Sequence, residues 1–191
     1  TLDMVLRLDD SSGDFSRVFS YKPDSSTDFG FDVQYFHADD DEYLAILYQT
    51  DGGYRTAWMA IREDQILDGE LHRLTISRDA ASGEFRSYLD GEFQYGEVVA
   101  PGTGFTPGGS LVIGQSQGVW APANDSNAAM SGVVGAIAIY DSVLSSADIA
   151  TGSLGTLADS TDSRLADYWV PDAASNSFTS VVGSHALTTR N

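Results

Sequence analysis

Apolar and polar residues alternate with a period of two along most of this chain, a pattern typical of half-buried β-strands. The alternation gives two clear apolar faces, one formed by Leu2, Met4, Leu6 and Leu8 and one formed by Phe29, Phe31, Val33 and Tyr35. Residues 43–48 form a continuous apolar run, which favours a buried central strand. Further strands are expected at 54–61, 71–78, 85–89, 111–113 and 134–140.

Turn-forming residues interrupt this pattern at intervals of roughly 8–12 residues, which indicates a β-sandwich. Asp90-Gly91 separates two strand-like segments and is a strong hairpin signal, because a type I′ turn needs positive φ at both positions. A short helix is expected near 145–151, with its start at Ser145, whereas Glu63-Asp64 is expected in a loop. The sequence therefore predicts an all-β fold, a two-sheet antiparallel jelly-roll sandwich with that one short helix.

We expect residues 1–191 to form a single domain, since this length fits one β-domain better than two. Residues 165–191 read as C-terminal strands that complete the sandwich, because about 27 residues cannot build a core alone. The alternative is that this tail is part of a neighbouring domain. The chain begins within a strand-like pattern and without Met, so we interpret it as a domain of a longer polypeptide with neighbouring domains.

The composition excludes several classes of function. The net charge of −18, from 28 acidic against 10 basic residues, argues against binding to nucleic acid or to anionic membranes. No apolar run approaches the roughly 18 residues of a membrane span, so membrane insertion is not expected. The chain has no cysteine, which excludes a thiol nucleophile, an iron–sulfur cluster and a thiolate zinc site.

One stretch carries a resemblance to a known family. Gly114-Gln-Ser-Gln-Gly118, a polar loop, Ser131-Gly132 and the segments 137–141 and 144–148 follow the hairpin at 88–91. This order resembles the second half of the laminin G-like and pentraxin jelly rolls, which are related to the concanavalin A-like lectins. Upstream, 18–21 and 40–42 resemble the Ile-Phe-Ser-Tyr and Asp-Asn-Glu segments of pentraxins. The similarity covers about residues 2–150 and implies calcium binding, which many members use to hold a sugar or an anionic ligand.

The resemblance also implies where calcium would bind. Gln117 and Asp125 match a glutamine and an acid of the pentraxin site, whereas Ser116 and Gly118 replace two of its acids, which favours a single ion. Calcium prefers six to eight hard oxygens, and the acidic triplet Asp39-Asp40-Asp41 supplies such ligands. We expect Ca²⁺ as the cofactor, held by Asp40, Asp41, Gln117, Asn124 and Asp125. The alternative is that the triplet is an exposed loop and 124–127 a polar turn.

Trp120 lies in the middle of this polar loop, beside Ala121-Pro122, where no core is expected. An exposed aromatic ring next to a metal loop suits stacking on the C–H groups of a sugar. Trp120 could equally hold the loop against the sandwich. We expect sugar contacts from Trp120, Asn127, Asp39 and Tyr54.

Three apparent catalytic patterns are not convincing. Residues 114–118 match Gly-x-Ser-x-Gly, but that nucleophile motif needs a helix after the serine, and 119–127 contain a proline and two asparagines. Related glucanases carry Glu-x-Asp-x-x-Glu, and no predicted strand has such a triplet. His37, His72 and His185 are scattered, and we interpret His72 as structural. We therefore expect no enzymatic activity.

These observations favour calcium-dependent carbohydrate binding by an extracellular adhesion module, at the cell surface and in a large protein such as a bacterial adhesin. Sugar hydroxyls would coordinate the calcium, and the partners would be cell-surface glycans or small saccharides. The alternative is a laminin G-like structural or protein-binding spacer in which calcium only stiffens a loop.

Overall fold

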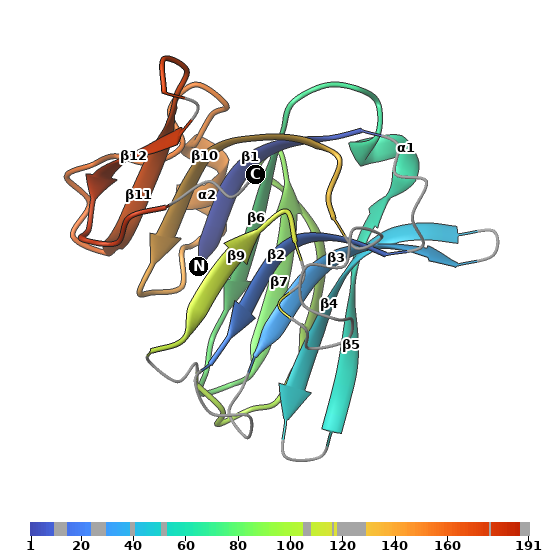
Figure 1. Cartoon of the computed structure of the whole chain (residues 1–191). Helices are drawn as coiled ribbons and strands as arrows, with labels where there is room; N and C mark the ends of the chain where they lie inside the picture. The colour runs from blue at the N-terminus through green and yellow to red at the C-terminus, as the bar shows by residue number, and fades with distance from the viewer. Residues whose placement is uncertain are drawn as a thin grey trace.

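A computed structural model of the protein describes residues 1–9, 15–23, 30–38, 41–50, 53–104, 108–115, 117, 129–175 and 177–187. Two antiparallel sheets form a sandwich (Figure 1). The larger sheet has the order β12-β11-β10-β1-β6-β7-β8, with β1 (Leu2–Leu8), β6 (His72–Arg78), β7 (Glu84–Leu89), β8 (Glu92–Val98), β10 (Gly132–Tyr140), β11 (Leu165–Asp172) and β12 (Ser177–Val182). The smaller sheet has the order β5-β4-β3-β2-β9, with β2 (Phe15–Lys22), β3 (Phe31–Ala38), β4 (Asp41–Thr50), β5 (Gly53–Arg62) and β9 (Ser110–Ile113). The predicted two-sheet sandwich is confirmed.

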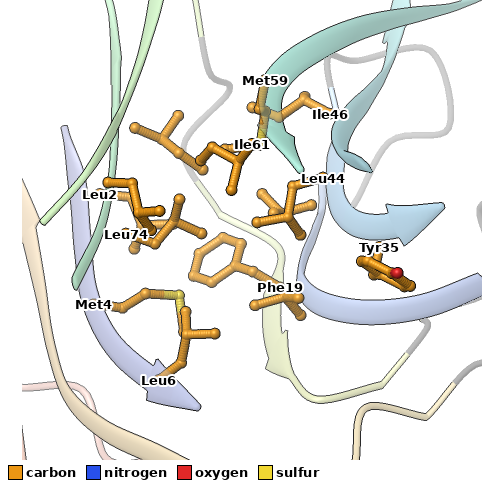
Figure 2. Packing of buried hydrophobic residues seen from close by; sticks show 14 of the residues in the cluster. Leu2, Met4, Leu6, Phe19, Tyr35, Leu44, Ile46, Met59, Ile61 and Leu74 are labelled. Carbon is orange, nitrogen blue, oxygen red and sulfur yellow. The ribbon is translucent and has the colours of Figure 1, made fainter. Parts of the chain in front are cut away.

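The core lies between the two sheets, where the apolar faces expected from the alternation meet. Figure 2 shows side chains of β1 and β6 pointing toward those of β4 and β5 across the sandwich. Buried residues from both sheets form this cluster, among them Leu2, Met4, Leu6, Leu74, Phe19, Tyr35, Leu44, Ile46, Met59 and Ile61. On β4 the run 44–48 is buried on both faces, as its continuous apolar sequence predicts.

The turn and helix predictions are confirmed with one correction. Asp90 and Gly91 have φ values of 52° and 85°, as a type I′ hairpin turn requires. Helix α2 (Ser146–Thr151) begins after Ser145, whose side chain accepts a hydrogen bond from Asp148 N at 3.1 Å. The expectation of a loop at residues 63–64 is wrong, because α1 (Glu63–Ile66) forms there. Gln65 Oε1 accepts from the N–H of Arg62, and Ile66 anchors this single turn in the core.

The outer face of the seven-stranded sheet carries a second apolar cluster under α2 and the 157–158 segment. A buried ion pair fixes this layer. Arg73 Nε donates to both oxygens of Asp3, at 2.9 and 3.0 Å, and Arg73 Nη1 donates to Ile149 O in α2. Within the described residues, neither helix is long and apolar enough to cross a membrane.

Candidate functional site

The β3–β4 turn and the segment between β9 and β10 leave the five-stranded sheet at the same end. Phe19 of β2 lies opposite Ile113, the last residue of β9. At the start of β2, Phe15 pairs with Phe36 of β3. Two residues farther along β3, Ala38 pairs with Asp41 of β4. The β3–β4 connection therefore lies at the end of the sheet from which the chain leaves β9.

Hydrogen bonds close the base of the segment between β9 and β10. Gly114 N donates to Val18 O at 3.0 Å, and Met130 N donates to Gly114 O at 2.9 Å. Ala129 forms a parallel bridge with Arg17. Both ends of the segment thus lie against β2, at Arg17 and Val18, in the half of this strand that is nearer the β3–β4 connection.

Gln117 is the one expected metal ligand whose side chain the structure describes. Its side-chain amide forms hydrogen bonds with backbone carbonyl oxygens. Its Nε2 donates to Ser20 O at 2.8 Å and to Ser110 O at 2.9 Å. Ser20 lies opposite Asp32, six positions before Ala38 on β3, which is roughly 20 Å along a strand at about 3.3 Å per residue. The structure therefore does not bring Gln117 and Asp41 together. The side-chain amide fastens the chain after β9 onto β2.

Tyr54 lies at the opposite end of the sheet from the acidic triplet. It pairs with Gln49 on β4, eight positions after Asp41, which corresponds to roughly 26 Å along the strand. The β4–β5 hairpin explains this separation, since Tyr54 follows the turn at the far end of β4. The structure does not bring Tyr54 to the acidic triplet as a sugar contact.

The remaining predicted site residues fall in parts of the chain for which side chains are not described. Asp39, Asp40, Trp120, Asn124, Asp125 and Asn127 lie outside the described residues, and for Asp41 only the backbone is described. Among the described side chains, no group of three or more His, Asp or Glu is arranged to hold a metal ion. Calcium ligation by Asp40, Asp41, Asn124 and Asp125 stays a prediction.

Part of the outer face of the five-stranded sheet, on β2 and β3, is buried although it carries polar side chains. Asp32 and Gln34 have exposed fractions of 0% and 1%, and they alternate with the core residues of β3. Ser20 Oγ donates to Asp32 Oδ1 at 2.5 Å, and Arg17 Nε lies 3.5 Å from Asp32 Oδ2. Burial raises the pKa of Asp32, and the Ser20 hydroxyl and Arg17 offset part of that effect.

Trp58 is a candidate sugar contact that is not among the residues predicted from the sequence. It lies on this same outer face, opposite Ala45, and 43% of its surface is exposed. The signal was present in the alternation, because Ala57 and Met59 point into the core and the residue between them must point outward. An exposed indole at an edge strand offers a flat apolar surface to a ligand.

The fold is shared with sugar-binding proteins. A family model of the concanavalin A-like lectin/glucanases superfamily matches residues 1–150. A heptameric pentraxin from Limulus polyphemus is 18% identical, with a TM-score of 0.59, and the match covers 94% of this chain and 78% of that one. A CBM40 module of a Ruminococcus gnavus sialidase, solved with α2,3-sialyllactose, is 15% identical, with a TM-score of 0.56 and coverages of 78% and 79%.

A third neighbour is domain 4 of an extracellular arabinanase from Geobacillus stearothermophilus, solved with arabinotriose. It is 15% identical, with a TM-score of 0.53, and the match covers 78% of this chain and 63% of that one. No curated protein matches the sequence. At these identities the likeness shows the fold, and the family match over residues 1–150 shows the family. The chain belongs to the concanavalin A-like lectin/glucanases superfamily.

Proposed function

We propose that this protein is a calcium-dependent carbohydrate-binding module of an extracellular adhesion protein. The observation that carries the proposal is topological. The β3–β4 connection, to which the acidic triplet belongs in the sequence, and the end of β9 lie at the same end of the five-stranded sheet. The sugar-binding modules that share the fold support carbohydrate as the ligand class.

Within this proposal, calcium would be held by Asp40 and Asp41 from the β3–β4 turn and by Asn124 and Asp125 from the segment after β9. When bound, calcium supplies positive charge to which two neighbouring sugar hydroxyls bind in place of water. Gln117 is not assigned to this ion, because its amide bonds Ser20 O and Ser110 O at a different level of the sheet. Its role is to hold the start of the segment.

Sugar contacts are assigned to Trp120, Asn127 and Asp39, which accompany the metal residues in the sequence. The indole of Trp120 provides an apolar surface for the C–H face of a pyranose ring. Tyr54 is not assigned, because its place at the far end of β4 separates it from the triplet. A single monosaccharide would bind with a Kd in the millimolar to high micromolar range, about −4 to −6 kcal/mol, so adhesion would depend on several modules acting together.

A glycan array in calcium and in chelator tests the function. We expect binding to defined saccharides in calcium, loss of that binding in chelator, and loss in the double variant Asp40→Ala/Asp41→Ala. The control variant Asp64→Ala/Glu70→Ala removes two exposed carboxylates at α1 and after it, and so changes the net charge equally. Its binding should equal that of the wild type.

Two outcomes oppose the proposal in different ways. Calcium binding without any glycan signal supports the spacer function, in which the ion only stiffens a loop. Glycan binding that persists in chelator would show that binding does not need calcium. It would favour the outer face that carries Trp58 as the sugar-binding surface.

A further inference from the structure

His72 at the start of β6 is held between two carboxylates, one at each ring nitrogen. Its Nδ1 lies 2.8 Å from Asp90 Oδ2, and its Nε2 lies 3.0 Å from Asp68 Oδ1. Asp90 belongs to the β7–β8 turn, and Asp68 to the connection between α1 and β6. The imidazole therefore joins two segments that the chain separates by about twenty residues.

This geometry requires a charged ring. A neutral imidazole has one N–H and one lone pair, so one of its nitrogens would face a carboxylate oxygen without a hydrogen between them. Asp68 and Asp90 expose 44% and 47% of their side chains, and the hydrogen bond with His72 lowers the pKa of Asp68. Imidazole is a stronger base than a carboxylate that water solvates. At neutral pH the second proton therefore belongs on His72 and not on either carboxyl group.

Within the part of the chain that the structure describes, no further charged group acts on the His72 ring. The residue opposite it on β1 is Leu6, and the side chain of its neighbour Arg73 is engaged with Asp3 on the other face of the sheet. Asp90 and Asp68 are the charged groups that act on the ring. Both favour the imidazolium form.

We propose that Asp68, His72 and Asp90 form a proton-dependent clamp that fastens the α1–β6 connection to the β7–β8 turn when His72 is protonated and releases it when the proton leaves. Asp90 has a second anchor, because its Oδ1 accepts the N–H of Arg73 at 2.8 Å and its own N–H donates to Arg73 O. After deprotonation the neutral ring keeps the Asp90 bond through Nδ1–H. The bond to Asp68 is the one that is lost.

The direction of the pH effect follows from the pKa of His72. Burial opposes the ring's charge, but the hydrogen bonds to Asp90 and Asp68 outweigh it and raise the pKa above 6.5. The folded chain therefore binds this proton more tightly than the unfolded chain does. The clamp's contribution is fully present below the pKa of an unfolded histidine, about 6.5, and is lost as pH rises through the higher pKa of the folded state.

An NMR titration of the His72 ring in the wild type and in Asp68→Asn tests the clamp. The asparagine keeps an oxygen for the N–H of Glu70, which Asp68 accepts at 2.8 Å, and removes only the charge that faces the ring. We expect the titration midpoint of His72 to lie above 6.5 in the wild type and to fall in Asp68→Asn. Amide exchange at residues 67–71 should quicken in the wild type as pH passes the midpoint, after correction for the intrinsic pH dependence of exchange.

Asp79→Asn is the matched control. Asp79 accepts the N–H of Ala81 at 2.8 Å in a turn of the same kind, and no histidine of the described residues affects its pKa. This variant should leave the midpoint of His72 unchanged. A wild-type midpoint at or below 6.5, or an equal shift in both variants, would overturn the proposal. His72→Gln provides a second test, because this variant should abolish the pH dependence of amide exchange at residues 67–71.

Discussion

Gly152 lies directly against the guanidinium group of Arg73, so a Cβ at this position would overlap Cζ and Nη1 of that side chain. Arg73 cannot move aside easily, because Asp3 and the carbonyl oxygen of Ile149 hold it in place. Gly152→Ala should therefore lower the free energy of unfolding by about 1–3 kcal/mol, the usual cost of forcing an extra methyl group into a packed site. A thermal melt should show a fall of at least several degrees.

Gly155→Ala is the control for that melt. It lies three residues away in the same connection, and a Cβ there would meet no atom within 4 Å. Because both substitutions restrict the unfolded chain equally, their difference measures the overlap with Arg73. Equal melting temperatures for the two variants would show that the ion pair adjusts without cost.

The sequence was sufficient for the sandwich because alternation fixes which face of each strand is buried. Val33 and Tyr35 show this on β3, and Met59 and Ile61 show it on β5. Alternation cannot give the position of a residue along a neighbouring strand, which depends on pairing register. Family resemblance therefore groups Gln117 with Asp41, whereas the pairing register separates them along the sheet.

The polar outer face of the five-stranded sheet was missed for a related reason. Asp32 and Gln34 occupy the outward positions of β3, where polar residues normally meet water. The local sequence does not indicate that these two outward side chains are buried. Helix α1 was missed because it is a single turn whose stability comes from Ile66 in the core rather than from helix propensity.

Gln117→Glu separates anchoring from metal ligation. A carboxylate at this position would face the carbonyl oxygens of Ser20 and Ser110, which now accept from the amide. Losing both hydrogen bonds should reduce stability by about 1–3 kcal/mol in a denaturant titration. A Gln94→Glu variant adds the same charge on the edge strand β8, where the amide loses one hydrogen bond, to Glu92 O at 3.2 Å, and a carboxylate can still accept from Gln65, so its effect should be smaller. Tighter calcium binding by Gln117→Glu, without loss of stability, would make Gln117 a ligand.

Calcium should stabilise the fold. A ligand bound only by the native state adds about 2.7 kcal/mol at a hundredfold excess over its Kd. For a domain of this size we expect a rise on the order of 5–10 °C in Tm when millimolar calcium is added to chelated protein. Asp125→Ala and Asp40→Ala/Asp41→Ala should each abolish the rise while the protein still folds. An unchanged Tm of the wild type on adding calcium would count against the calcium site. A calcium-induced rise in Tm that persists in the double variant would show that Asp40 and Asp41 are not calcium ligands.

Trp120→Ala tests the sugar contact independently of the metal. Loss of the stacking area should weaken saccharide binding by roughly 1–2 kcal/mol, whereas calcium affinity should stay near the wild-type value because indole offers no oxygen ligand. Trp58→Ala tests the alternative sugar surface, since Trp58 is 43% exposed on β5, three strands from the β2 residues that support the segment after β9. When the sugar stacks on Trp120, removing the Trp58 indole should leave sugar affinity unchanged. Calorimetric titration of both variants decides between the two surfaces, because a loss confined to Trp58→Ala would place the sugar on the outer face of the five-stranded sheet and make Trp120 a packing residue.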